Sequence, residues 1–277
     1  MGTFISFLFG ILIVVGSVTV STDSPMVFIN YPSIIIVLGG TLAVSFISYE
    51  FKVIIKSFGL ALSAFTTHRD SHRSLKHDIG QIVHWAYIIQ KNGLQGLENE
   101  ISEYTRTSEP FLTYGADLVV TGYTGAEVRQ ILEHSMTTKF EKENDQVSVM
   151  RKMAGDAPAF GMLGTIIGLV IMLGNMSADP GALGASMAIA LITTFYGIIL
   201  ARVIFIPLAT RLAERLDITM LKNTLQMEGL VLLAERKSPR YIQDKINSFV
   251  EPTEQFLIDR DMRDLRDFAM NTSTTTE

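Results

Sequence analysis

Three threonines inside long apolar segments are the residues of this chain best suited to chemistry. Thr165 lies in the segment 157–176, and Thr193 and Thr194 lie side by side in the segment 182–207. If the two segments form an antiparallel helical hairpin, the threonines sit at a similar depth, since each lies at a similar distance from the short connection. Hydroxyl and carbonyl oxygens at one depth can replace part of the water shell of a small hard cation. The first interpretation is therefore an ion path.

A second interpretation is purely structural. A threonine in a membrane helix commonly bonds a carbonyl of its own preceding turn, which needs no ion. Thr193 and Thr194 project about 100° apart on a helix, so the pair presents oxygens in two directions. The residues alone leave both interpretations open.

A carboxylate is missing from this part of the sequence. Tight coupling to a cation that crosses a membrane usually needs a neutralisable acid in the path. The apolar segments contain no Asp or Glu; Glu50 and Asp156 lie at segment ends, and Asp179 lies in the connection. If this chain belongs to an ion-driven machine, we expect another chain to supply the carboxylate.

The elements that would position the threonines are four apolar runs: 4–20, 33–49, 157–176 and 182–207. A helix of about 20 residues crosses a hydrocarbon core of about 30 Å, and none of the runs shows the polar face of a soluble helix. Glycines at 10, 16, 39 and 40 predict close helix contacts in the first two runs. The predicted fold class is an all-α membrane protein with four transmembrane helices, a large cytoplasmic helical loop and a helical C-terminal tail.

The basic residues predict the topology. No Lys or Arg precedes Lys52 or lies between Ser177 and Leu200, and almost all of them fall in 51–155 and 208–277. The positive-inside rule places both of these regions and both termini in the cytoplasm. Arg202 stands near the cytoplasmic end of the last run, where a snorkelling side chain is expected.

The residue types and motifs of the sequence argue against several classes of function. The chain has no cysteine for a disulfide framework, and its net charge of −5 with no basic arm argues against a nucleic-acid partner. It has no phosphate loop and no nucleophile elbow, so we expect no enzyme and no cofactor. His68, His72 and His77 lack the carboxylate or cysteine that would complete a metal shell, so no metal site is expected either.

The residue patterns of the soluble regions predict helices. Apolar residues recur at helical spacing from Ile79 to Ile89, before a C-cap at Asn92-Gly93. Thr124 and Glu127 form a capping box, whose helix runs toward the membrane. The predicted division of the chain is a first hairpin (1–50), a cytoplasmic helical domain (51–155), a second hairpin (156–207), and C-terminal helices with a disordered tail (208–277).

Longer motifs carry a family resemblance. The stretch Asp-Ala-Pro-Ala-Phe-Gly-Met-Leu-Gly-Thr-Ile-Ile-Gly-Leu at 156–169 resembles the signature of the MotA/PomA family of flagellar stator proteins. So does Ala-Leu-Ile-Thr-Thr-Phe-Tyr-Gly at 190–197, followed by Ile-Pro-Leu-Ala at 206–209. The resemblance covers the whole chain, including the first hairpin that TolQ/ExbB proteins lack.

The resemblance implies a multi-pass stator subunit of the bacterial inner membrane. Several copies, a pentamer in the family, would surround paired helices of a MotB/PomB-type partner that is anchored to peptidoglycan and carries the ion-accepting Asp. Inward cation flow would drive torque on the rotor protein FliG. Thr165, Thr193 and Thr194 match the sodium path of the PomA-like branch, so Na⁺ is favoured over H⁺ as the transported ion.

The resemblance also implies roles for four other residues. Pro158 and Pro207 match prolines that couple ion binding to the cytoplasmic domain, and their structural alternative is the shaping of helix ends. Lys91 and Glu98 match the charged motif that faces the rotor, where the alternative is a solvated helical surface. Two other functions stay open: a TolQ/ExbB-like proton-driven motor that energises an outer-membrane process, and an independent cation channel or carrier.

Overall fold

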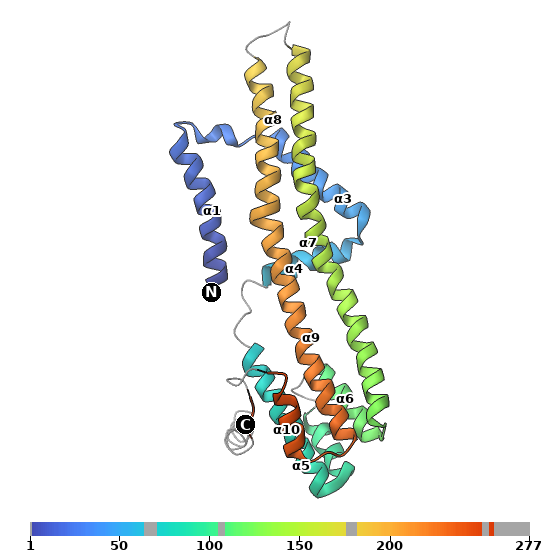
Figure 1. The fold of residues 1–277 in the computed structure, drawn as a ribbon. Coiled ribbons are helices and arrows are strands. Elements are labelled where there is room, and N and C mark those ends of the chain that lie inside the picture. The colour runs from blue at the N-terminus through green and yellow to red at the C-terminus, as the bar shows by residue number, and fades with distance from the viewer. Residues whose placement is uncertain (1, 64–70, 105–108, 176–181, 251–254, 258–277) are drawn as a thin grey trace, which may run out of the picture. The chain divides into compact units, whose positions relative to one another are not determined.

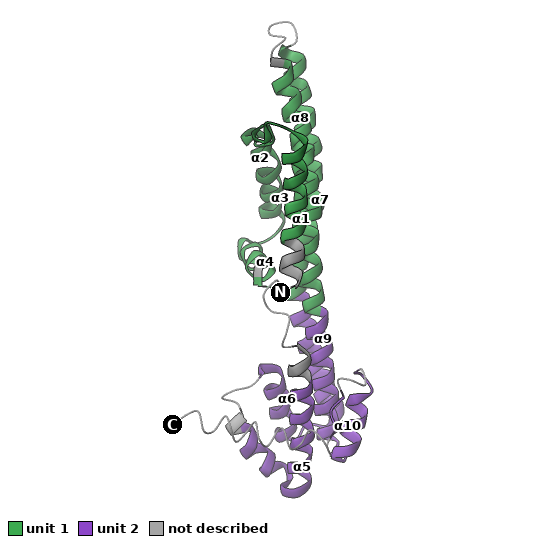
Figure 2. Cartoon of the chain, turned by 90° about the vertical axis from the view of Figure 1, so that its left-hand side faces the viewer, with its two compact units in different colours: residues 1–68, 142–216 green, residues 69–141, 217–277 purple. Residues whose placement is uncertain are grey.

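The computed structural model describes residues 2–63, 71–104, 109–175, 182–250 and 255–257, and every regular element in these ranges is a helix (Figure 1). The end of the chain, for which a disordered tail is predicted, lies outside the described residues. The chain divides into two compact units (Figure 2). Unit 1 comprises residues 1–68 and 142–216, and unit 2 comprises residues 69–141 and 217–277.

Unit 1 contains the apolar helices. From the N-terminal part of the chain they are α1 (Gly2–Ser21), a 3-10 turn η1 (Pro25–Phe28), α2 (Tyr31–Ile34), a π-helical turn η2 (Ile35–Gly39), α3 (Gly40–Ser48) and α4 (Phe51–Ser63). From the later part they are residues 142–175 of α7 (Gly125–Asn175), α8 (Ala182–Ile199), a second π-helical turn η3 (Leu200–Phe205) and the start of α9 (Ile206–Ala234). Three stretches are long and apolar enough to cross a membrane, within 25–48, 125–175 and 183–234, and Leu8–Ser21 is a shorter apolar helix. The chain is an all-α membrane protein, as predicted.

The second apolar run packs through a column of small side chains. Ser33, Val37, Thr41 and Ser45 recur every fourth residue and are all buried. The Thr41 and Ser45 hydroxyls donate to the Val37 and Thr41 carbonyls, and the Ser33 hydroxyl donates to Asn30 Oδ1, so each of these buried hydroxyls has a hydrogen-bond partner. A Cβ on Gly40 would overlap the Phe160 ring, so glycine is required for the approach to α7.

Not all predicted glycine contacts form. A Cβ added at Gly10 or Gly16 would have nothing within 4 Å, and one at Gly39 would touch only the Ile35 side chain of its own helix. The prediction of close contacts at these three positions is therefore wrong within this chain. The polar column of α2 and α3 takes the packing role instead.

Tyr196 fastens the turn of the first hairpin to α8. Its hydroxyl donates to the Phe28 carbonyl and accepts from the Asn30 amide at 3.4 Å. The rings of Phe28 and Phe195 also meet edge to face, with centroids 5.5 Å apart. These contacts fix the turn of the first hairpin against the side of α8.

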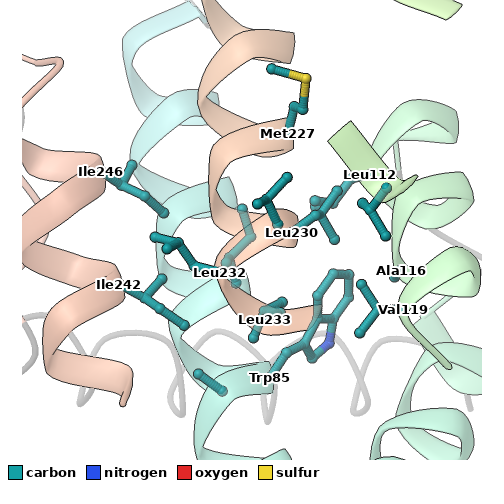
Figure 3. Packing of buried hydrophobic residues seen from close by; sticks show 14 of the residues in the cluster. Trp85, Leu112, Ala116, Val119, Met227, Leu230, Leu232, Leu233, Ile242 and Ile246 are labelled. Carbon is teal, nitrogen blue, oxygen red and sulfur yellow. The ribbon is translucent and has the colours of Figure 1, made fainter. Parts of the chain in front are cut away.

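Unit 2 is a helical domain with its own core. Its helices α5 (Ser71–Tyr104), α6 (Pro110–Thr121), α10 (Pro239–Asn247) and the adjoining parts of α7 and α9 enclose one apolar cluster. Figure 3 shows Trp85, Leu112, Leu230 and Ile246 converging from α5, α6, α9 and α10. The predicted break at Gly93 is present, since its φ of 69° and ψ of −166° interrupt α5.

Two charge clusters join distant parts of unit 2. Arg129 donates to both carboxylate oxygens of Glu228, at 2.5 and 2.8 Å, and this hydrogen bond lowers the pKa of Glu228. Lys222 lies 3.0 Å from Asp78 and 2.6 Å from Glu109. Burial disfavours the charge on Lys222, but bonding to Glu109 and the charge of Asp78 outweigh it, so the pKa of Lys222 is raised.

Candidate functional site

Helices α7 and α8 approach each other through glycines. A Cβ on Gly164 would lie 2.5 Å from Thr193 Cγ2, and one on Gly168 would lie 2.8 Å from the Ala190 backbone nitrogen. On the facing helix, a Cβ on Gly197 would lie 2.7 Å from the Ala157 carbonyl. The spacing of these glycines therefore brings the two backbones within reach of short polar side chains.

The close approach creates a cluster of four oxygens. The hydroxyls of Thr165 and Thr194 lie 2.6 Å apart. Thr165 Oγ1 also lies 3.1 Å from the Gly161 carbonyl and 3.0 Å from the Ala190 carbonyl, and Thr194 Oγ1 lies 3.4 Å from the Gly161 carbonyl. The structure thus brings together two of the three threonines singled out from the sequence. Both are only partly buried in this chain.

Thr193 occupies a different position. Its side chain is fully buried, and its hydroxyl donates to carbonyls of its own preceding turn, Ile189 at 3.0 Å and Ala190 at 2.9 Å. Its methyl group packs against Gly164. It therefore touches the oxygen cluster only through the Ala190 carbonyl, which Thr165 shares.

The two carbonyls are the part of this cluster that sequence reasoning missed. Gly161 stands one helical turn before Thr165, and that spacing was the only signal for its carbonyl. Nothing in the sequence singles out Ala190, because its contribution is a backbone atom that becomes available only where the glycines let the helices touch.

No acidic side chain joins the cluster, since the apolar segments contain none. Asp156 lies at the boundary of the segment and pairs with Lys152, with Nζ and Oδ2 3.2 Å apart. The described residues contain no group of three His, Cys, Asp or Glu side chains that could hold a metal ion. What the cluster offers is neutral oxygen ligands in an apolar setting.

The two prolines occupy different positions in their helices. Pro158 is inside α7, and Pro207 is the second residue of α9, which begins at Ile206 directly after the π-helical turn η3. A proline has no N–H to donate to the carbonyl four residues earlier, so each interrupts the hydrogen-bond ladder without ending the helix. Pro158 thus does not end a helix, whereas Pro207 lies in the first turn of α9, so both roles considered for these prolines stay predictions. Arg202 is exposed within η3.

Lys91 and Glu98 lie on either side of the Gly93 break in α5, and both are exposed. Leu97 between them is fully buried and anchors the segment to the core of unit 2. Within the ranges that the structure describes, neither charged group forms an ion pair. Contact of these two residues with the rotor stays a prediction.

The chain is similar in sequence to several known proteins. A profile of the MotA/TolQ/ExbB proton channel family matches residues 103–224. A motility protein A from Aquifex aeolicus is 33% identical over 245 residues, which cover 88% of this chain and 94% of the relative. This chain belongs to the MotA/TolQ/ExbB family. A chemotaxis protein PomA from Vibrio alginolyticus is 33% identical over 223 residues, which cover 80% of this chain and 85% of PomA.

Solved structures share the fold of this MotA/TolQ/ExbB member. A chain of the MotAB structure from C. jejuni matches with a TM-score of 0.79 at 20% identity, over 91% of this chain and 96% of that chain. A chain of the flagellar MotAB stator complex from Bacillus subtilis matches with a TM-score of 0.77 at 21% identity, over 92% and 98% of the two chains. The family consists of ion-channel proteins, so the chain is not an enzyme.

Proposed function

We propose that this chain is the ring-forming membrane subunit of a flagellar stator. It forms a homo-oligomer, expected to be a pentamer, around a single-span MotB/PomB-type partner, and it couples inward cation flow to torque on FliG. Relatives named motility protein A and PomA, which align with 88% and 80% of this chain, support this assignment. The observation that carries it is the oxygen cluster of Thr165 and Thr194 in a hairpin with no acid of its own.

The topology that this function requires has four spans in the bacterial inner membrane, formed by α1, by α2 to α3, and by the apolar parts of α7 and of α8 to η3. Both termini are cytoplasmic by the positive-inside rule. The division into 1–50, 51–155, 156–207 and 208–277 then separates a peripheral hairpin, a torque-generating domain, an ion-path hairpin and a C-terminal region.

In the proposed mechanism, a cation sheds part of its water onto the Thr165 and Thr194 hydroxyls and the Gly161 and Ala190 carbonyls. It then neutralises the partner's carboxylate, which removes a buried charge and lets the ring step past the partner. Pro158 and Pro207 pass the change to the cytoplasmic helices, and Lys91 and Glu98 engage the rotor. One elementary charge provides about 2.3 kcal/mol per 100 mV, so a single ion drives a small step.

Na⁺ is the proposed coupling ion, in preference to H⁺. A proton needs a titratable group or a water chain, whereas a sodium ion is held by several neutral oxygens at one depth. Thr193 stays a predicted ligand, but its packing against Gly164 suits it better to setting the helix spacing.

The experiment is swimming speed of cells that depend on this stator, measured against external sodium. The proposal expects speed to rise with sodium and to survive a protonophore when the sodium gradient is maintained. Speed that is unchanged on sodium removal and abolished by the protonophore would reverse the ion assignment. Absence of any motility defect on deletion would point instead to a TolQ/ExbB-like motor.

A further inference from the structure

Helix α4 follows a membrane span directly. Only Tyr49 and Glu50 separate it from α3, which ends the candidate span 25–48. One face of α4 is buried within unit 1: Ile54, Ser57 and Ala61 have relative exposures of 2%, 0% and 0%. The opposite side of the helix is open, and it is divided into two strips of different chemistry.

The first strip is apolar. Phe51 and Ile55 lie one turn apart and remain 62% and 56% exposed. The Phe51 ring stacks on Phe46 of α3, with centroids 5.5 Å apart, and Ile47 beside it is 85% exposed. Exposed apolar side chains of α3 and α4 therefore adjoin each other through this ring contact, with the exposed Glu50 in the connection between the two helices.

The second strip is basic. Lys52 and Lys56 also lie one turn apart, and both are exposed. The helix contains no Asp or Glu, and neither ammonium group has an ion pair or hydrogen bond within the described residues. Lysines with long apolar stems beside an apolar strip can reach from hydrocarbon to headgroup level.

We propose that α4 is a docking site for anionic phospholipid of the leaflet into which α3 emerges. Lys52 and Lys56 hold the phosphate diester, and Phe51 and Ile55 enter the acyl region beside it. Adjacent apolar and basic strips are the pattern of helices that lie in a membrane interface, where each nearby lysine favours anionic lipid. A protein partner fits less well, because lysine is depleted in protein–protein interfaces. The site rests on the membrane topology but not on the stator function.

The test is native mass spectrometry of the full-length protein in neutral detergent, titrated with phosphatidylglycerol or with phosphatidylcholine of the same acyl chains. Wild type should prefer phosphatidylglycerol, and each lysine should contribute about fivefold to that preference. The Lys52→Gln/Lys56→Gln variant should bind the two lipids alike. The control Lys139→Gln/Arg240→Gln also removes two exposed positive charges and should keep the preference.

Three results would overturn the site. They are equal binding of both lipids by wild type, an undiminished preference in the double lysine variant, and complete competition by inorganic phosphate, which would mean that the apolar strip adds nothing. Replacement of Phe51 and Ile55 by Ser should weaken binding of both lipids equally. Single lysine variants, each expected to lose part of the preference, keep the test decisive if the double variant unfolds. No readout depends on ion flux or rotation, so failure of the lipid site would leave the proposed stator function unaffected.

Discussion

The hydroxyl oxygens of Thr165 and Thr194 lie 2.6 Å apart, on two helices held together by glycines. One hydroxyl donates to the other, and the Gly161 and Ala190 carbonyls lie within reach of the remaining hydroxyl proton; the Ala190 carbonyl also accepts from Thr193. The cluster therefore gathers four neutral oxygens from two helices at one place. In the proposed mechanism these oxygens are ligands of the passing cation, which is the basis of the predictions on ion flow.

Replacing either threonine by valine should reduce cation flux while leaving the fold intact. Valine keeps the shape and removes the hydroxyl, and loss of one ligand to a charged group corresponds to roughly ten- to hundredfold. Because the hydroxyls act as a pair, Thr165→Val/Thr194→Val should cost less than the product of the single effects. Flux is measured in liposomes with the purified complex.

Two controls accompany that series. Thr210→Val removes a hydroxyl that bonds only the Ile206 carbonyl of its own turn, and it should leave flux unchanged. Thr165→Ser and Thr194→Ser keep the oxygen and should restore most of the flux. Equal loss in Thr210→Val would show that the assay responds to helix stability rather than to the oxygen cluster.

Alanine at Gly168 should loosen the α7–α8 contact. Its Cβ would lie 2.8 Å from the Ala190 backbone nitrogen, which cannot move aside as a side chain can, and overpacking of this kind costs about 1–3 kcal/mol. Gly174→Ala is the matched control in the same helix, with nothing within 4 Å. Thermal unfolding in detergent should show a lower Tm for Gly168→Ala only, and equal values would contradict the contact.

Stability should depend on pH through Glu228. Its pKa lies below the ordinary value of 4.5 because Arg129 donates to it, so its contribution is present above that value and is lost as pH falls through the folded-state pKa. Glu228→Gln should be less stable than wild type at pH 7 by about 1–3 kcal/mol, and the difference should shrink in acid. A difference that is constant from pH 7 to pH 3 would exclude the carboxylate as its source.

Lys222→Met should strongly destabilise unit 2, because it leaves Asp78 charged and 3% exposed with Gln226 as its remaining close donor. Loss of one partner of a buried ion pair costs about 3–5 kcal/mol. Adding Asp78→Asn should restore much of the lost stability. Lys237→Met at an exposed lysine serves as control, and a double variant no better than Lys222→Met would rule out the pair.

Charge reversal at Lys91 or Glu98 should impair rotation without reducing membrane assembly. Both groups are exposed, so neither stabilises the core, and their contacts are expected to weaken in salt. Rotation is followed by tethered-cell speed and assembly by membrane fractionation. Lys139→Glu is the control, and normal rotation in both variants would argue against a rotor contact at α5.

Local features of the fold were predictable from sequence. The capping box is present, since Thr124 N donates to Glu127 Oε2 at 2.8 Å and Glu127 N to Thr124 Oγ1 at 3.4 Å. The helix it starts does continue into the third apolar segment as α7. These features depend on neighbouring residues, so composition and spacing suffice to find them.

Features that join distant residues were not predictable. Arg129 and Glu228 are 99 positions apart, and no pattern links Tyr196 to the Phe28 carbonyl. Thr194 joins the oxygen cluster, whereas Thr193 packs against Gly164. Which of the two faces the cluster depends on how α8 is rotated about its axis, and helix packing rather than sequence spacing determines that rotation. The depth of the threonines was accessible from sequence, but their orientation was not.

The central claim is that this chain supplies an oxygen-lined half of an ion path whose carboxylate belongs to another polypeptide. Cation uptake into liposomes, measured with the purified chain alone and together with its single-span partner, tests it most directly. We predict no uptake by the chain alone and sodium uptake by the complex that falls in Thr165→Val/Thr194→Val. Uptake by the chain alone at the rate of the complex would contradict the claim.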